Sequence, residues 1–289
     1  MFWTLTNIMI KSISCIVPIY GLTQNKNLQY FEELLESLFI AIPCLGDNFE
    51  LIIVNDDRKR ISRKLVLDIC KKHRLQKYVV YEENIENRGQ AFSRNIGASL
   101  AQSKYLHFID QDDYISENYY TELITYVSEF DMYLFKPYFF MQKTGQIRKA
   151  YTYILKCLYV KSRTVKELWP LMLNNIAYSP GQVIISKDAY TRNGGFPVLS
   201  NKGSDDYGLF YHMVFDDNVS FIYMDAAKFF YRVHSQQSSR NCNMNSSVCE
   251  FLQMVKPNSC KSRLIHFFKT KKYCTLFVKA FYILVFKRG

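Results

Sequence analysis

The chain has 289 residues, of which 48% are hydrophobic, and it carries a formal net charge of +11. This length suits one large domain, or one domain with an appendage, and the apolar content is enough for a sizeable core. No apolar run reaches the roughly 18–20 residues of a membrane span, and Lys11 makes the first twenty residues a poor signal peptide. The eight cysteines show no metal-like spacing, which favours reduced, buried thiols.

Continuous strands and amphipathic helices alternate in the first half of the sequence. The apolar runs 13–19, 50–55, 77–82 and 104–109 are typical of strands, and helices are predicted over 28–42, 61–74 and 89–102. This alternation favours a parallel sheet with helices on both faces. We therefore expect an α/β fold with a mostly parallel central sheet.

The second half of the sequence is less regular. Strands are predicted at 132–140, 151–160, 181–186, 219–224 and 228–234, and helices at 164–173 and 203–214. A tight turn is expected at 193–197, and the polar residues 235–247 are expected to form a loop or linker.

The positive charge lies mainly at the C-terminal end. After Glu250 no acidic residue follows, while nine lysines and arginines do. Nucleic acid, an anionic membrane surface or a phosphorylated substrate would each suit a basic protein. The body before this tail is nearly neutral, and residues 261–289 mix basic with aliphatic and aromatic residues. Such a segment fits an amphipathic helix at a membrane interface; the alternative is a helix that packs on the domain.

Polar residues gather where predicted strands end. Pro18 to Tyr20 end the first strand, Asp56 follows the second, and Asp110, Asp112 and Asp113 follow the fourth. Ligands bind at the carboxyl ends of the strands in parallel sheets, so these residues should converge on one crevice. Aspartates two positions apart can hold Mg²⁺ or Mn²⁺ and leave coordination positions for a diphosphate. The alternative is a turn of solvated carboxylates.

An ordered series of motifs resembles the family-2 glycosyltransferases with the type-A nucleotide-sugar-binding fold. It spans about residues 12–240 and comprises SCIVPIYG, ELIIVNDD, ENRGQAFSRNIGASLAQSKYLHFIDQDD, GQVIISKDAYTRNGGF, SDDYGLF and FYRVHSQQSS. The resemblance implies a single Rossmann-like domain over 1–240, with a donor half at about 12–115 and an acceptor half at 116–240. Residues 241–289 would be a linker and a membrane-associating basic tail. Gly21, Asn55, Ser103 and Asp205 stand where the family commonly has Asn, Asp, Gly and Glu.

The resemblance also implies how the donor is bound. Pro18, Tyr20 and Asp56 would line the nucleotide base of a UDP-sugar. Arg88 and Arg94, near a predicted helix start, would meet anionic groups, although surface solvation or an internal ion pair is the alternative.

A second group of residues would hold the metal and the diphosphate. Asp110 would contact the ribose or support the metal, Asp112 would bind Mn²⁺ or Mg²⁺, and Asp113 would shape the site. His234 would be a second ligand for the metal or phosphate. Arg232 would pair with a phosphate or with a local carboxylate.

The resemblance implies an inverting transfer of the sugar to a hydroxyl of a glycan acceptor. Asp206 would be the general base and Asp205 would raise its pKa, although helix capping is an alternative role for both. Which of the two is the base stays open. The expected acceptor is a glycan on a polyprenyl diphosphate lipid, in O-antigen or capsule synthesis at the cytoplasmic face of the inner membrane.

Three other functions compete with this interpretation. A sugar nucleotidyltransferase would need a Gly-rich, basic loop after the first strand, whereas GLTQNKN stands there. A nucleic-acid-binding protein would carry basic and aromatic residues on its body, whereas the predicted crevice is acidic, so no nucleic acid is expected as a partner. A non-catalytic sugar-binding relative would not need Asp112, Asp206 and His234.

Overall fold

The computed structural model describes residues 11–126, 128–149, 175, 177–200, 203–216, 218–235, 237 and 244–254. The predicted strand at 151–160, the predicted helix at 164–173 and the basic tail at 261–289 lie outside these residues. Within the described ranges, no helix is both long and apolar enough to cross a membrane.

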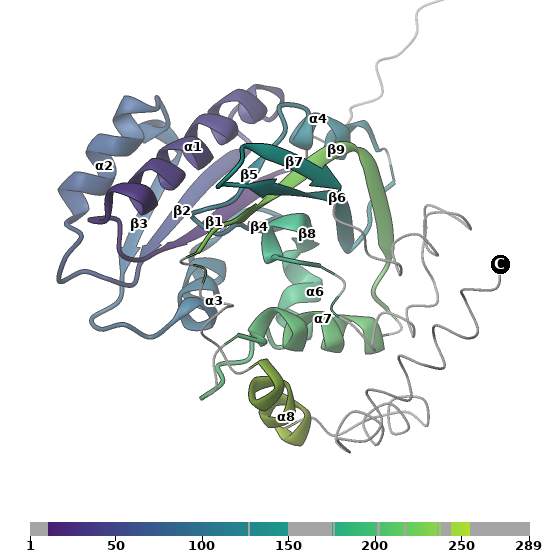
Figure 1. The fold of residues 1–289 in the computed structure, drawn as a ribbon. Coiled ribbons are helices and arrows are strands. Elements are labelled where there is room, and N and C mark those ends of the chain that lie inside the picture. The colour runs from purple at the N-terminus through teal and green to yellow at the C-terminus, as the bar shows by residue number, and fades with distance from the viewer. Residues whose placement is uncertain are drawn as a thin grey trace, which may run out of the picture.

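The first half forms a parallel α/β layer, as predicted (Figure 1). The elements are β1 (Ile13–Ile19), α1 (Asn25–Ala41), β2 (Phe49–Asn55), α2 (Arg63–Lys72), β3 (Val79–Glu83), α3 (Gln90–Leu100) and β4 (Tyr105–Phe108), with short 3₁₀ turns at Ile42–Cys44 and Gln76–Tyr78. β1 pairs in parallel with both β2 and β4, and β2 pairs in parallel with β3.

The second half extends this sheet with strands of both directions. Its elements are β5 (Tyr114–Ile115), α4 (Tyr119–Thr125), β6 (Met132–Met141), β7 (Gln146–Lys149), the 3₁₀ turn η4 (Pro180–Gln182), β8 (Val183–Ser186), α6 (Lys187–Arg192), α7 (Asp205–Phe215), β9 (Phe221–Val233) and α8 (Met244–Met254). The strand order is β3-β2-β1-β4-β8-β6-β9-β5, and β7 pairs with β6. Because β8 runs antiparallel to β4 and β6, the sheet is mixed rather than mostly parallel.

The two strands predicted at 219–224 and 228–234 are in fact one strand, β9. The polar and small residues between them, Asp225 to Ala227, fall at a register shift against β6. Glu122 of α4 accepts hydrogen bonds from the backbone N–H groups of Ala226 and Ala227 there. The break in the apolar pattern is therefore a β-bulge, which a sequence pattern does not distinguish from a loop.

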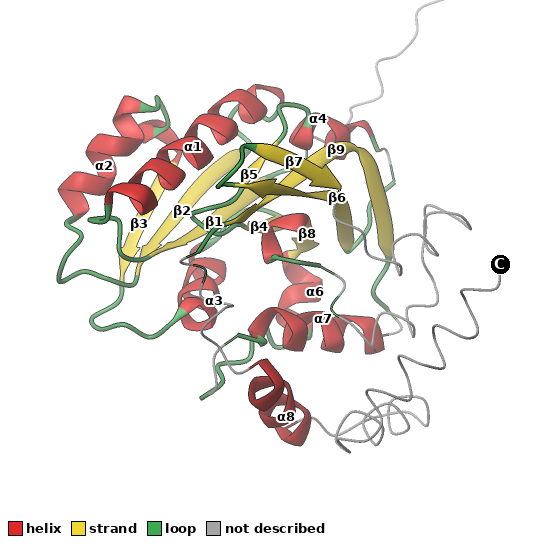
Figure 2. Ribbon diagram, in the orientation of Figure 1, coloured by secondary structure: helices red, strands yellow, loops and turns green. Residues whose placement is uncertain are grey.

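Helices cover both faces of the sheet, as predicted (Figure 2). Successive side chains of a strand point to opposite faces, so Cys15 and Val17 of β1 pack with α1 and α2 while Ile16 packs with α3. On the α3 face, α6 and α7 continue the apolar layer under the second half of the sheet.

A glycine on α3 allows the helix to lie close to β1. A Cβ atom added at Gly97 would stand 2.4 Å from Cγ2 of Ile16. We expect Gly97→Ala to lower the free energy of unfolding by about 1–3 kcal/mol through overpacking, although alanine favours helix formation. Urea unfolding would measure this, with Ser99→Ala on the exposed side of α3 as the matched control. A Gly97→Ala protein as stable as the wild type would contradict the close packing.

The last described helix belongs to the domain core. Phe251 and Leu252 of α8 are buried against Tyr207 and Tyr211 of α7, although a linker and a basic tail are predicted for all of 241–289. The described cysteines are free, and burial raises the pKa of Cys15 and Cys70 to about 12. Cys249 on α8 is exposed, so the prediction of buried thiols does not hold there.

Candidate functional site

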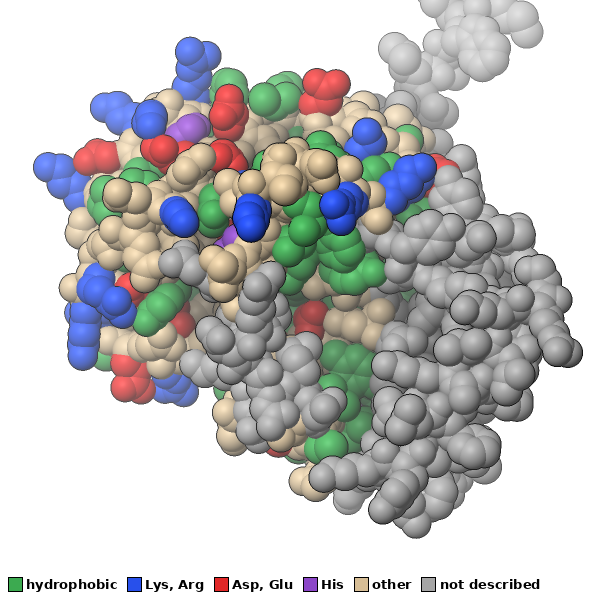
Figure 3. Space-filling model, in the orientation of Figure 1, with side chains coloured by type: hydrophobic (Ala, Val, Ile, Leu, Met, Phe, Trp, Pro, Cys, Tyr) green, Lys and Arg blue, Asp and Glu red, His purple; other side chains and the backbone are tan. Residues whose placement is uncertain are grey.

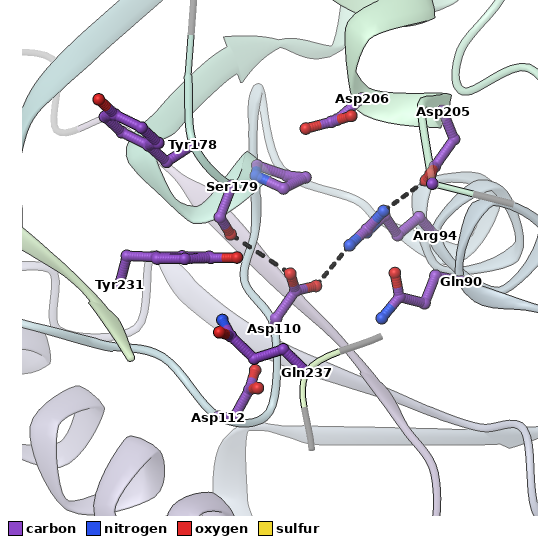
Figure 4. Close-up of a pocket in the computed structure, with 12 residues that line it drawn as sticks. Gln90, Arg94, Asp110, Asp112, Tyr178, Ser179, Asp205, Asp206, Tyr231 and Gln237 are labelled. Carbon is purple, nitrogen blue, oxygen red and sulfur yellow. Dashed lines mark hydrogen bonds and ion pairs between the residues drawn. The ribbon is translucent and has the colours of Figure 1, made fainter. Parts of the chain in front are cut away.

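A trough lies at the carboxyl ends of β1, β2 and β4. It consists of two adjoining hollows, which share Gln90, Asp110, Asp112 and Gln237 as lining residues. One hollow, which we call the β1 end, is lined also by Pro18, Tyr20, Asp56, Gln111 and His234. The other, the α7 end, is lined also by Arg94, Asp205, Asp206, Tyr178 and Tyr231 (Figure 4). The expected convergence of the strand ends is thus confirmed.

Tyr20 forms a braced wall at the β1 end. Its backbone N–H donates to Oε1 of Gln111 at 2.8 Å, and Nε2 of Gln111 donates to its carbonyl oxygen at 2.9 Å. Arg60 donates to the Tyr20 hydroxyl at 2.9 Å and lies 5.5 Å from the ring centroid. The ring is therefore held in place although Tyr20 is 43% exposed.

Asp56 holds the turn that leads into α3. Its Oδ1 accepts hydrogen bonds from Nδ2 of Asn84 at 2.7 Å and from the Arg88 N–H at 2.8 Å, and Oδ2 accepts from the Gly89 N–H at 2.8 Å. Gly89 has φ +86°, a conformation that favours glycine. The Arg88 side chain lies over Phe92 and lines a separate groove, so only its backbone meets Asp56.

Arg94 joins the two halves of the domain at the floor of the trough. Its side chain is 2% exposed, and it donates to Asp205 Oδ2 at 2.6 Å and to Asp110 Oδ1. Ser179 Oγ donates to the other oxygen of Asp110 at 3.3 Å. Of the three roles considered for Arg94, the geometry matches the internal ion pair.

Asp112 and His234 form a direct pair beside this cluster. Nε2 of His234 lies 2.8 Å from Oδ2 of Asp112, and both side chains line the β1 end of the trough. Asp110, the third expected metal ligand, is engaged by Arg94 instead. In the part of the chain that the structure describes, no three His, Cys, Asp or Glu side chains gather as a metal site.

Arg232 supports the turn that carries Asp112 and does not line the trough. Its side chain is 1% exposed, and Nε donates to the Asp112 carbonyl oxygen at 2.6 Å. The other guanidinium nitrogens bind Glu33 and Gln142, so its partner is a local carboxylate. The backbone N–H of Arg232 donates to Asp113 Oδ1, and burial raises the pKa of Asp113, as do the charges of Asp112 and Asp110.

Asp205 and Asp206 begin α7 but have different partners. Asp205 is bound to Arg94, whereas Asp206 accepts hydrogen bonds from Asn175 Nδ2 at 2.9 Å and from the Tyr207 N–H at 2.7 Å. Burial, followed by the charge of Asp205, raises the pKa of Asp206 to about 7. The predicted effect of Asp205 on this pKa is confirmed, with burial as the larger cause.

Several lining residues were not among the candidates from sequence. Gln90, Gln111, Tyr231 and Gln237 stand inside or beside the quoted motifs, which is the signal that could have indicated them. Tyr178 and Ser179 come from an irregular segment that precedes η4, where no periodicity marks a functional residue. Tyr178, Tyr231 and Phe139 form an aromatic cluster at the α7 end, with Phe139 and Tyr178 centroids 4.8 Å apart.

Similar sequences include a teichoic acid biosynthesis protein and a glycosyltransferase. The minor teichoic acid biosynthesis protein GgaB of Bacillus subtilis (strain 168) is 32% identical over 141 residues, which is 46% of this chain and 14% of GgaB. The glycosyltransferase GlyG of Streptococcus pneumoniae serotype 4 is 31% identical over 124 residues, covering 43% of this chain and 37% of GlyG. The match thus spans well under half the length of either relative.

Solved structures share the fold. Staphylococcus aureus TarS (residues 1–349) in complex with UDP-GlcNAc superposes with a TM-score of 0.64 at 20% identity, covering 84% of this chain and 65% of that one. The mannosyltransferase PcManGT from Pyrobaculum calidifontis, in complex with GDP-Man and Mn²⁺, gives a TM-score of 0.62 at 12% identity, covering 96% and 76%. The model described as glycosyl transferase family 2 matches residues 14–193, more than half of the sequence. With this match, the chain belongs to glycosyl transferase family 2.

Proposed function

We propose that this chain is an inverting, metal-dependent glycosyltransferase that moves a sugar from a UDP-sugar to a hydroxyl of a glycan acceptor. One observation carries the proposal: a single trough holds the Asp112–His234 pair at its β1 end and Asp206 at its α7 end. The nucleotide would lie against Tyr20 and Asp56, and the sugar would lie between the metal and Asp206.

The Asp112–His234 pair fits two ligands of one divalent cation. In an octahedral ion with ligands at about 2.1 Å, neighbouring donor atoms are about 3 Å apart, close to the 2.8 Å between Oδ2 and Nε2 here. Carboxylate oxygen and neutral imidazole are both ligands that Mn²⁺ accepts. The bound cation would neutralise the charge that grows on the leaving diphosphate. Arg232 would keep Asp112 in place through its carbonyl oxygen.

Asp206 is the proposed general base. Its pKa of about 7 suits a group that accepts a proton from a hydroxyl near neutral pH. The acceptor oxygen would attack the anomeric carbon, the bond from that carbon to the diphosphate would break, and the hydroxyl proton would pass to Asp206. A single displacement inverts the anomeric carbon. Asp205, held by Arg94, would position α7 and raise the pKa of its neighbour.

The related proteins support the choice of substrates. TarS binds UDP-GlcNAc, PcManGT binds GDP-Man and Mn²⁺, and GgaB is named for teichoic acid biosynthesis. We infer a donor half at about 12–115 and an acceptor half at 116–240, acting on a glycan carried by a polyprenyl diphosphate lipid in O-antigen or capsule synthesis. Within residues 241–289, α8 packs on α7, and the basic residues 261–289 would associate with the cytoplasmic face of the inner membrane.

Calorimetric titration of UDP, with GDP and CDP in parallel, tests the donor site. Wild type is expected to bind UDP only with Mn²⁺, and Asp112→Ala is expected to weaken that binding at least tenfold, since even residues that support a metal ligand are worth about 10–100-fold in affinity. Asp68→Ala, at an exposed carboxylate of α2, is the matched control and should bind as wild type does. Failure of the wild type to bind any nucleotide would exclude the transferase proposal.

A further inference from the structure

One face of the sheet outside the trough combines aromatic and basic side chains. Lys149 of β7 is paired with Tyr138 of β6, which is paired with Phe230 of β9; Ile147 is likewise paired with Phe140. Directly opposed residues in a sheet point to the same side. We call this surface the aromatic–basic face and define it by Tyr138, Phe140, Ile147, Lys149, Lys228 and Phe230.

The rings of this face are held by neighbours on the same side of the sheet. Tyr114 of β5 stacks on Phe230 with centroids 4.6 Å apart and meets the edge of Phe140 at 5.6 Å. The guanidinium of Arg232 lies 5.2 Å from the Phe140 ring, and its charge is paired with Glu33. The face is thus a packed platform whose aromatic side chains remain partly exposed.

Apolar and basic groups reach solvent side by side on this platform. Ile147 is 55% exposed, and Lys149 and Lys228 are exposed, with Lys228 Nζ 5.4 Å from the Tyr138 ring. Figure 3 shows hydrophobic side chains next to Lys and Arg side chains over β6 and β7. Contiguous exposed apolar patches that are rimmed by polar residues mark contact surfaces for proteins or membranes.

The charged residues of β6, the β6–β7 turn and β7 are all basic. Residues 132–149 contain four basic residues and no acidic one. Lys149 lies on the face, whereas Arg148 is paired with Phe139 and points to the other side of the sheet. In β9 the only carboxylate is Asp225, which lies in the bulge. Neither Lys149 nor Lys228 forms an ion pair within the described residues. The face therefore complements an anionic partner.

We propose that the aromatic–basic face docks on an anionic lipid bilayer. Aromatic rings and an aliphatic side chain suit the headgroup level of a bilayer, and lysines beside them reach the lipid phosphates. Phe230 is four residues from His234 in an extended strand, which is about 13 Å at about 3.3 Å per residue. The bilayer surface would then lie close to the trough, where a lipid-linked acceptor is needed. That last step rests on the proposed function, whereas the docking does not.

Co-sedimentation of the full chain with vesicles tests the docking. The vesicles are phosphatidylcholine alone or phosphatidylcholine mixed with phosphatidylglycerol. The face variant is Lys149→Glu/Lys228→Glu. The matched control is Lys59→Glu/Lys64→Glu, which makes the same charge change on exposed residues just before α2 and in its first turn. We expect the face variant to lose at least tenfold in partition to anionic vesicles, given about 1 kcal/mol per basic residue near such a surface, and the control to lose much less.

The comparison separates the face from the basic tail, because both variants keep residues 261–289 unchanged. Ile147→Ser, a change at an exposed position, should give a smaller fall in partition and no change in folding. The proposal would be overturned if the face variant and the control partitioned equally to anionic vesicles. It would also be overturned if the wild type bound anionic vesicles no better than phosphatidylcholine vesicles. A face variant that binds vesicles normally but loses a dimer in gel filtration would make the face an interface between copies. Metal-dependent UDP binding, measured on each variant, reports the proposed function independently.

Discussion

Replacing Asp206 with asparagine is expected to lower the rate of sugar transfer by about 10²–10⁴-fold, the usual contribution of a positioned base. The amide side chain would keep an oxygen that can accept the Tyr207 N–H bond, so the start of α7 should be preserved. The affinity for UDP should not change, because Asp206 lines only the α7 end of the trough. The measurement is the acceptor-dependent release of nucleoside diphosphate from the sugar donor.

The pH dependence of the wild-type rate gives a second readout. A base must be deprotonated to act, and the pKa of Asp206 is raised to about 7, so the rate should increase as pH rises through about 7. Asp205→Asn removes a charge that raises this pKa, and it should move the midpoint of the profile to lower pH. A rate that Asp206→Asn leaves intact, or a midpoint that Asp205→Asn leaves in place, would contradict the assignment of the base.

The residues at the strand ends of the trough could be predicted from the sequence. Each follows a short apolar run, and that run alone indicates where a strand ends. Asp56 and Asp110 each follow a short apolar run, and parallel neighbours in a sheet bring their carboxyl ends to one edge. The pairing of β1 with β2 and β4 confirms that step. Local periodicity was enough because alternating strands and helices predict a parallel sheet, even though β4 pairs with β1 rather than with its sequence neighbour β3.

The partners of the arginines could not be predicted in this way. Arg94 meets Asp205, which lies 111 residues further along the chain, and Arg232 meets Glu33, which lies 199 residues away. No periodicity relates such positions, so the sequence left open whether each cation would meet an anionic ligand or a carboxylate of the chain, and the structure shows carboxylate partners for both. The direction of β8 depends likewise on contacts with both β4 and β6, which the sequence pattern does not encode.

Loss of the Arg94 cation should have the largest effect on stability. We expect Arg94→Met to lower the free energy of unfolding by about 3–5 kcal/mol, the usual cost of leaving buried charges without a partner. The side chain is 2% exposed, and its loss would leave Asp110 and Asp205 facing each other without a cation between them. Urea unfolding at neutral pH measures the change.

The same variant should recover part of its stability in acid. Burial already raises the pKa of Asp110, and Arg94 opposes that rise; without the cation the folded-state pKa must be higher still. A carboxyl with a raised pKa in the folded state stabilises the fold at low pH and loses that contribution as pH rises through the folded pKa. The difference in the free energy of unfolding between wild type and Arg94→Met should therefore become smaller as pH falls below neutrality.

Arg192→Met is the matched control for the Arg94 variant. Arg192 makes an ion pair of similar length with Asp216, at 2.8 Å, but its side chain is 44% exposed. Exposed pairs contribute about 0–1 kcal/mol, so this change should have little effect at any pH. Equal losses in the free energy of unfolding of the two variants would mean that burial does not determine how much the Arg94 ion pairs stabilise the fold. A large loss in the free energy of unfolding for Arg94→Met alone, which becomes smaller in acid, would show that the buried ion pairs of Arg94 stabilise the contact between the two halves of the domain.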